Sequence, residues 1–151
     1  MEIKLKNNIE QPLGRILSHI GRNFLHLLNA KLDHLDIERN YYALILIQTT
    51  KSGMTQQELA ELMDTDKVSV VRIIDYLSNK GYVKRVKNVS DRRKYCLVLT
   101  AKAEKEMTVI KKMLAEATEI AFKGLKKSQI TEFYNIVGKI RSNLNKHNSI
   151  L

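Results

Sequence analysis

The chain has 151 residues, of which 44% are hydrophobic and 28% are charged, a composition that excludes a disordered chain or a mini-domain without room for a core. The formal net charge is +10, which favours an anionic partner such as nucleic acid or an acidic membrane surface. A single cysteine, Cys96, excludes an intramolecular disulfide, and no apolar run is long enough for a signal or a membrane span. We therefore expect a folded, cytoplasmic protein without membrane contact.

The first predicted helix runs from Gln11 to about Asp33. Pro12 suits its first turn, where a missing N–H costs nothing. Apolar residues recur three and four positions apart, as they do along one face of a helix: Leu13, Ile16, Leu17, Ile20, Phe24, Leu27, Leu28 and Leu32. This pattern predicts a long amphipathic helix.

The next segment, residues 38–52, allows two interpretations. Its run from Ala43 to Ile47 is apolar on every side and fits a buried strand as well as a helix. The length of the segment favours the helix. Gly53 follows as a stop residue with free access to positive φ.

The residues from Thr55 to Gly81 predict a helix-turn-helix. The motif TQQE at 55–58 has the spacing of a capping box and begins a helix that ends near Asp64, which tolerates left-handed φ in the turn. Thr65 or Asp66 then caps a second helix. Gly81 suits the left-handed position after it.

Two alternating segments follow, YVKRV at 82–86 and YCLVL at 95–99, and they predict a β-hairpin with a charged tip, a wing. Helical spacing returns from about Thr100 to Leu125 and from Ser128 to about Lys146. The fold class is therefore mainly α (α+β), a winged helix-turn-helix.

The second helix of the motif is the one that enters the major groove in such proteins. Arg72 can offer two donors to guanine, Ser69 can bond a base edge or a phosphate, and the Val68 and Val71 methyls can touch thymine. The alternative is a solvated charged face. The candidate DNA-binding residues on the motif are Thr55, Gln56, Lys67, Val68, Ser69, Val71 and Arg72.

The tip of the wing carries the other candidate DNA-binding residues: Asp91, Arg92, Arg93 and Lys94. A cationic hairpin suits the narrow minor groove of A·T-rich DNA, where the negative potential is deepest. Asp91 can hold the Arg93 guanidinium in a bidentate pair and so reduce the entropy lost on docking. An exposed ion pair of little energetic value is the alternative.

A resemblance to a known family covers residues 55–100. The stretch is similar to the signature region of the MarR family of winged helix-turn-helix transcriptional regulators. Its matches to the family pattern D-x-R-x-x-x-V-x-L-T, with leucine for valine, are Asp91, Arg93, Leu97, Leu99 and Thr100. The helix-turn-helix part matches at Glu58-Leu59-Ala60, Leu77 and Lys80-Gly81. The departures are valine at 68 and 71, where serine or threonine is commoner, and Ala103 in place of glycine.

The resemblance implies a dimerisation lobe from residues 1–36 and 101–151 and a DNA-binding lobe from 37–100. It also implies a homodimeric repressor on an inverted-repeat operator, with recognition helices about 34 Å apart. A small apolar or aromatic effector would bind in a crevice between the lobes, and its binding would release the DNA. The residues that could line this crevice could equally well belong to the core: Ile16, Ile20, Phe24, Tyr41, Tyr42 and Met107.

Other functions find less support in the residues. No nucleophile–base pair or glycine-rich phosphate loop appears, so we expect no enzyme and no cofactor. His19, His26 and His34 lie seven and eight apart, which is not the spacing of convergent metal ligands, so no metal site is expected. A redox sensor based on Cys96 and an effector-free winged helix that binds only protein are the alternatives to a ligand-controlled regulator.

Overall fold

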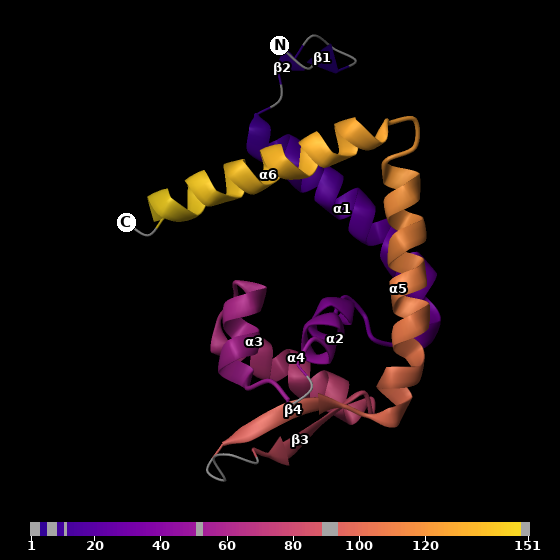
Figure 1. The fold of residues 1–151 in the computed structure, drawn as a ribbon, viewed down its shortest axis with the longest axis vertical. Helices are drawn as coiled ribbons and strands as arrows, with labels where there is room; N and C mark the ends of the chain where they lie inside the picture. Colours follow the sequence, from indigo (N-terminus) through magenta and orange to yellow (C-terminus); the bar gives the residue numbers. More distant parts are fainter. Residues whose placement is uncertain (1–3, 6–8, 11, 51–52, 89–93, 149–151) are drawn as a thin grey trace. The chain divides into compact units, whose positions relative to one another are not determined.

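The computed structural model describes residues 4–5, 9–10, 12–50, 53–88 and 94–148. The chain divides into two compact units, unit 1 (Met1–Ala117) and unit 2 (Thr118–Leu151). Figure 1 shows the elements in chain order. They are β1 (Lys4–Leu5), β2 (Ile9–Glu10), α1 (Leu13–Leu32), the 3-10 helix η1 (Asp33–Leu35), α2 (Tyr41–Gln48), α3 (Gln56–Met63), α4 (Lys67–Asn79), β3 (Val83–Lys87), β4 (Tyr95–Leu99), α5 (Ala101–Ala121) and α6 (Lys127–Asn148). The mainly helical fold class is confirmed.

The apolar run at 43–47 is helical, as its length suggested. It forms most of α2, in which Ala43, Leu44 and Ile47 are buried and the residues between them pack partly against the core. The short antiparallel pair β1–β2 was not predicted. Pro12 is the N-cap of α1 rather than a first-turn residue, and its carbonyl accepts the Arg15 N–H at 2.9 Å.

The helix-turn-helix consists of α3 and α4, which pack against each other. Both halves of the capping box form, since Thr55 Oγ1 accepts the Glu58 N–H at 3.2 Å and Glu58 Oε2 accepts the Thr55 N–H at 2.7 Å. Asp64 turns the chain with φ +51°, in the left-handed region predicted for it. Asp66, rather than Thr65, caps α4. Local hydrogen bonds thus define both ends of the turn.

The wing is the antiparallel pair β3–β4, in register from Val83↔Leu99 to Lys87↔Tyr95. Beside this pair, Met54 forms a single-residue antiparallel bridge with Leu97, in which the two N–O distances are 3.1 and 2.6 Å. Successive residues of a strand point to opposite faces, yet both Cys96 and Leu97 are only 1% exposed. Leu97 belongs to the core, whereas Cys96 packs against Gly53.

The hydrophobic core lies in unit 1 and joins α1, α2, α4, the wing and α5. An ion pair between Lys31 and Glu116, 2.8 Å long, also links α1 to α5. In unit 2, the rings of Phe122, Phe133 and Tyr134 meet edge to face at 5.5–5.7 Å. The largest fully buried side chains are Tyr82, Leu28, Leu32, Ile37, Leu44, Ile47, Leu59, Ile74, Leu77, Leu97, Met107 and Ile110.

Gly53 is the glycine whose substitution we expect to disturb the fold. Its φ is +85°, and an added Cβ would lie 2.7 Å from the Cys96 Cβ and 3.2 Å from the Val98 Cγ1. Gly53→Ala therefore adds overpacking to left-handed strain, and we expect it to lower the free energy of unfolding by about 3 kcal/mol in urea denaturation.

Gly81→Ala is the matched control. Gly81 also has positive φ, +75°, but no heavy atom lies within 4 Å of its added Cβ. Gly81→Ala should therefore lower the free energy of unfolding only through the left-handed backbone strain, by about 1 kcal/mol. Equal losses for the two variants would contradict the steric account of Gly53.

Candidate nucleic-acid interface

Helix α4 buries one face and exposes the other. Val70, Ile74 and Leu77 are fully buried. On the outward face, Val68 is 62% and Val71 42% exposed, and Lys67 and Arg72 are exposed as well. Neither cation forms an ion pair within the part of the chain that the structure describes. The face expected to read DNA is therefore solvent-accessible and cationic.

The start of α3 is more enclosed than the sequence indicated. Thr55 and Gln56 are both half-buried. The Thr55 hydroxyl is held by Glu58, and the Gln56 Nε2 is shielded from solvent without an acceptor among the described residues. The Glu58 pKa lies below its ordinary value, because of the Thr55 N–H first and the Thr55 hydroxyl next. Thr55 and Gln56 thus present less free polar surface than α4.

Only part of the wing tip belongs to the described residues. Asp91, Arg92 and Arg93 lie outside them, whereas Lys94 is described and exposed. Its carbonyl accepts the Asn88 N–H at 2.9 Å and closes the hairpin.

One ion pair joins the wing to α4. Arg85 of β3 pairs with Asp75 at 2.7 Å, and both side chains are about a third to a half exposed. An exposed pair adds little stability, but this one connects the two elements that are expected to touch DNA.

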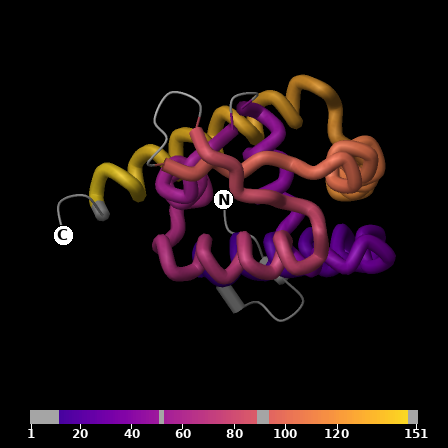
Figure 2. The backbone as a smooth tube through the Cα atoms, turned by 90° about the horizontal axis from the view of Figure 1, so that it is seen from below, coloured from indigo at the N-terminus to yellow at the C-terminus, as the bar shows by residue number. Residues whose placement is uncertain are grey.

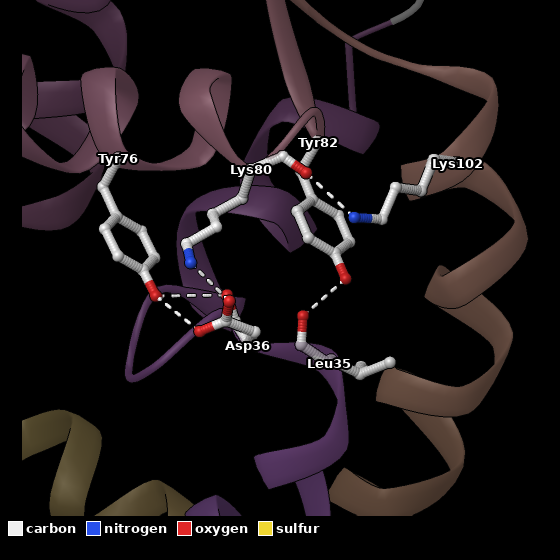
Figure 3. Close-up of polar contacts among 6 residues, drawn as sticks. All are labelled: Leu35, Asp36, Tyr76, Lys80, Tyr82 and Lys102. Atoms are coloured by element: carbon white, nitrogen blue, oxygen red, sulfur yellow. Dashed lines mark hydrogen bonds and ion pairs between the residues drawn. The ribbon is translucent and has the colours of Figure 1, made fainter.

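Polar contacts at the other end of α4 were not predicted (Figure 3). The Tyr76 hydroxyl lies 3.1 Å from the Asp36 carbonyl and 3.2 Å from its carboxylate, and Lys80 pairs with the same carboxylate. The Lys80 hydrogen bond is the main reason why the Asp36 pKa is lowered. Asp36 has a positive φ of +51°, which aspartate tolerates. The residue type was therefore the signal in the sequence for a turn at this position.

Two further residues complete this cluster. The Tyr82 hydroxyl donates to the Leu35 carbonyl at 2.6 Å. Lys102, at the start of α5, donates to the Lys80 carbonyl at 2.8 Å and lies 4.1 Å from the centre of the Tyr82 ring. The segment between α4 and the wing is thus held by residues before α2 and after β4.

Two adjoining clefts, of about 370 and 480 Å³, lie beside α1 and share Asn29, Asp33 and Arg39. Most of the residues that line them are polar or charged, and none is among the apolar residues that we considered as effector contacts. Of those, Met107 is buried in the core, Phe24 and Tyr41 pack partly against it, and Ile20 and Tyr42 are exposed.

Comparison with known proteins identifies this arrangement. Residues 35–94 match the MarR family. A MarR transcriptional regulator from Methanosarcina mazei Go1 is 27% identical, with a TM-score of 0.79 over 89% of this chain and 96% of that one. The matched segment, which spans α2, the helix-turn-helix and β3, is thus similar to the winged helix of the MarR family.

Two solved structures of lower sequence identity share the fold. The transcriptional regulator SlyA is 21% identical, with a TM-score of 0.81 over 90% of this chain and 96% of its own. CouR from Rhodococcus jostii RHA1, bound to p-coumaroyl-CoA, is 24% identical, with a TM-score of 0.78 over 86% of this chain and 92% of its own.

The match to the MarR family indicates the broad class of protein. MarR proteins are DNA-binding transcriptional regulators with a winged helix, not enzymes. Among the described helices of this chain, none is both long and apolar enough to cross a membrane. The described residues also hold no group of three or more side chains suited to a metal ion.

The Asp36 contacts predict a pH dependence of stability. Because the folded-state pKa of Asp36 is depressed, its contribution is complete above the ordinary carboxyl pKa and is lost as pH falls through the folded value. We expect Asp36→Asn to lower the free energy of unfolding at pH 7.

The difference from the unchanged protein should shrink as the pH is lowered through the acid range, and urea unfolding at a series of pH values measures it. Lys80→Met removes the partner and should flatten the dependence in the same way. A difference that stays constant with pH would exclude the charged form of Asp36 as its cause.

Proposed function

We propose that this MarR-family protein is a homodimeric, sequence-specific repressor that acts on double-stranded DNA in the cytoplasm and releases it when a small molecule binds. The observation that carries the proposal is the outward face of α4. Its cations are exposed and its orientation is set by buried residues on the opposite side. The wing beside it offers a second contact with DNA.

Each residue of the proposed interface has a distinct role. The Arg72 fork suits guanine O6 and N7, and the Val68 and Val71 methyls suit thymine methyls in the major groove. Lys67, a point charge at the helix start, suits a phosphate. Arg92 and Arg93, with Asp91 as partner, are proposed for the minor groove together with Lys94.

The homodimer is proposed from exposed apolar side chains on single helices. Leu13, Leu17 and Ile20 on α1 are 42–58% exposed, and Phe133, Val137 and Leu144 on α6 are 37–56% exposed. Each set has helical spacing, and such stripes mark interaction surfaces. We assign residues 1–36 and 101–151 to the dimerisation lobe and 37–100 to the DNA-binding lobe. A twofold dimer requires an inverted-repeat operator.

The effector is proposed as a small apolar or aromatic molecule. The CouR structure contains p-coumaroyl-CoA, which has an aromatic acyl group. A ligand that favours the wrong spacing of the two recognition helices weakens DNA binding by its differential affinity for the two states.

The structure does not favour the alternative redox mechanism, because the Cys96 side chain is only 1% exposed and an oxidant would not reach its sulfur. A winged helix that binds only protein would not require the exposed cations of α4. The small-molecule regulator is the function we retain.

Arg72→Ala tests the proposed interface. We expect it to weaken binding to a selected operator by about 1–3 kcal/mol, since the bidentate contact with guanine is lost. Arg72→Lys keeps the charge without the fork, so it should retain non-specific affinity but lose discrimination at that base. Fluorescence anisotropy with specific and random duplexes measures both.

Salt provides the second part of this test. Affinity should fall steeply between roughly 50 and 200 mM salt, because phosphate contacts release counterions. A flat response, or equal losses for the two Arg72 variants on every duplex, would contradict base reading by α4.

Analytical ultracentrifugation of Val137→Asp should show monomers if the stripe on α6 forms the dimer.

A further inference from the structure

The Ser69 hydroxyl, on the first turn of α4, is already engaged within the protein. Asp66 accepts the Ser69 N–H at 2.9 Å through Oδ1 and the Ser69 hydroxyl at 2.6 Å through Oδ2. An ionised carboxylate can only accept, so the serine must donate in the second bond. The one proton of that hydroxyl is therefore used before DNA arrives.

Asp66 stays ionised at neutral pH. The hydrogen bond from the Ser69 hydroxyl, followed by the one from its N–H, holds the Asp66 pKa below its ordinary value. A hydrogen bond to an ionised acceptor is roughly twice as strong as one between neutral groups. The Ser69 hydroxyl consequently continues to donate its hydrogen bond to Asp66 in preference to a neutral acceptor on a base.

The oxygen of Ser69 is left with its lone pairs only. In the major groove, adenine N6 and cytosine N4 offer amino donors, whereas guanine and thymine present acceptors at N7, O6 and O4. Phosphate oxygens also only accept. An acceptor on α4 thus attracts an amino group and repels the edges of guanine and thymine.

We infer that Asp66 determines part of the base preference of this regulator. By holding the hydroxyl proton, it makes Ser69 an acceptor that selects adenine or cytosine at the base it faces. The inference rests on the proposed entry of α4 into the major groove. Asp66 is a positioning residue here, since it acts through Ser69 and has no contact of its own with the base.

Asp66→Asn inverts the polarity of this pair and tests the inference. Asparagine keeps a carbonyl oxygen for the Ser69 N–H, so the helix cap is retained. Its amide N–H₂ replaces Oδ2 and donates to the Ser69 oxygen, which frees the hydroxyl proton for the DNA.

The experiment is binding-site selection from random duplexes, followed by affinities for the four bases at the position concerned. The unchanged protein should prefer adenine or cytosine there by roughly fivefold, the value of one hydrogen bond. Asp66→Asn should move the preference to guanine or thymine. Removal of a negative charge also raises affinity for every duplex, so the ratio between bases is the decisive quantity.

Variants of Ser69 provide the controls. Ser69→Ala should lose the preference at this position alone, and Ser69→Thr, which keeps the hydroxyl, should restore it. Thermal unfolding of Asp66→Asn should match that of the unchanged protein if the cap is intact, which separates polarity from folding.

Two outcomes would overturn the inference, and they are distinguishable. An operator that is selected with the same base preference by Asp66→Asn would show that the polarity of Ser69 does not depend on Asp66, although α4 still reads DNA. A protein that enriches no sequence would remove the inference together with the proposed function.

Discussion

The proposed DNA interface depends on the burial of one face of α4. Val70, Ile74 and Leu77 are completely enclosed, and each such side chain contributes about 1.5–3 kcal/mol when it leaves water. A rotation of the helix by one residue would turn this stripe toward solvent. The core therefore fixes the side of α4 on which Lys67 and Arg72 are exposed, so the proposed contact with DNA would use an orientation that hydrophobic packing has already determined.

Polar contacts then hold both ends of α4. Asp66 accepts the Ser69 N–H in the first turn, and Asp36 is contacted by Tyr76 in the last turn and by the C-cap residue Lys80. A helix that is fixed before it meets its partner loses less conformational entropy on binding. The contacts at the far end also connect α4 with the beginning of α5, through Lys102. Figure 2 shows the backbone of α4 and of the strands β3 and β4 from below; all three elements belong to unit 1.

The features predicted correctly are those that nearby residues define. The capping box at Thr55 and Glu58 and the left-handed Asp64 each depend on residues within one turn. The choice of Asp66 over Thr65 as cap is local, but the sequence offered both residues. The bridge between Met54 and Leu97 and the burial of Cys96 needed the structure, because they depend on contacts between distant segments. The wing residues Asp91, Arg92 and Arg93 and the division into two lobes remain predictions.

The sequence alone determined the order of the elements, the helix-turn-helix and the exposed character of the α4 face, since periodicity and capping are encoded within a few residues. It also placed the charge that an anionic partner requires. Only the tertiary structure decided that Asp36 meets Lys80, 44 positions later, and that the Gln56 amide nitrogen is shielded from solvent. Such choices between competing hydrogen-bond partners depend on which groups packing brings within reach, and no local pattern of residues specifies them.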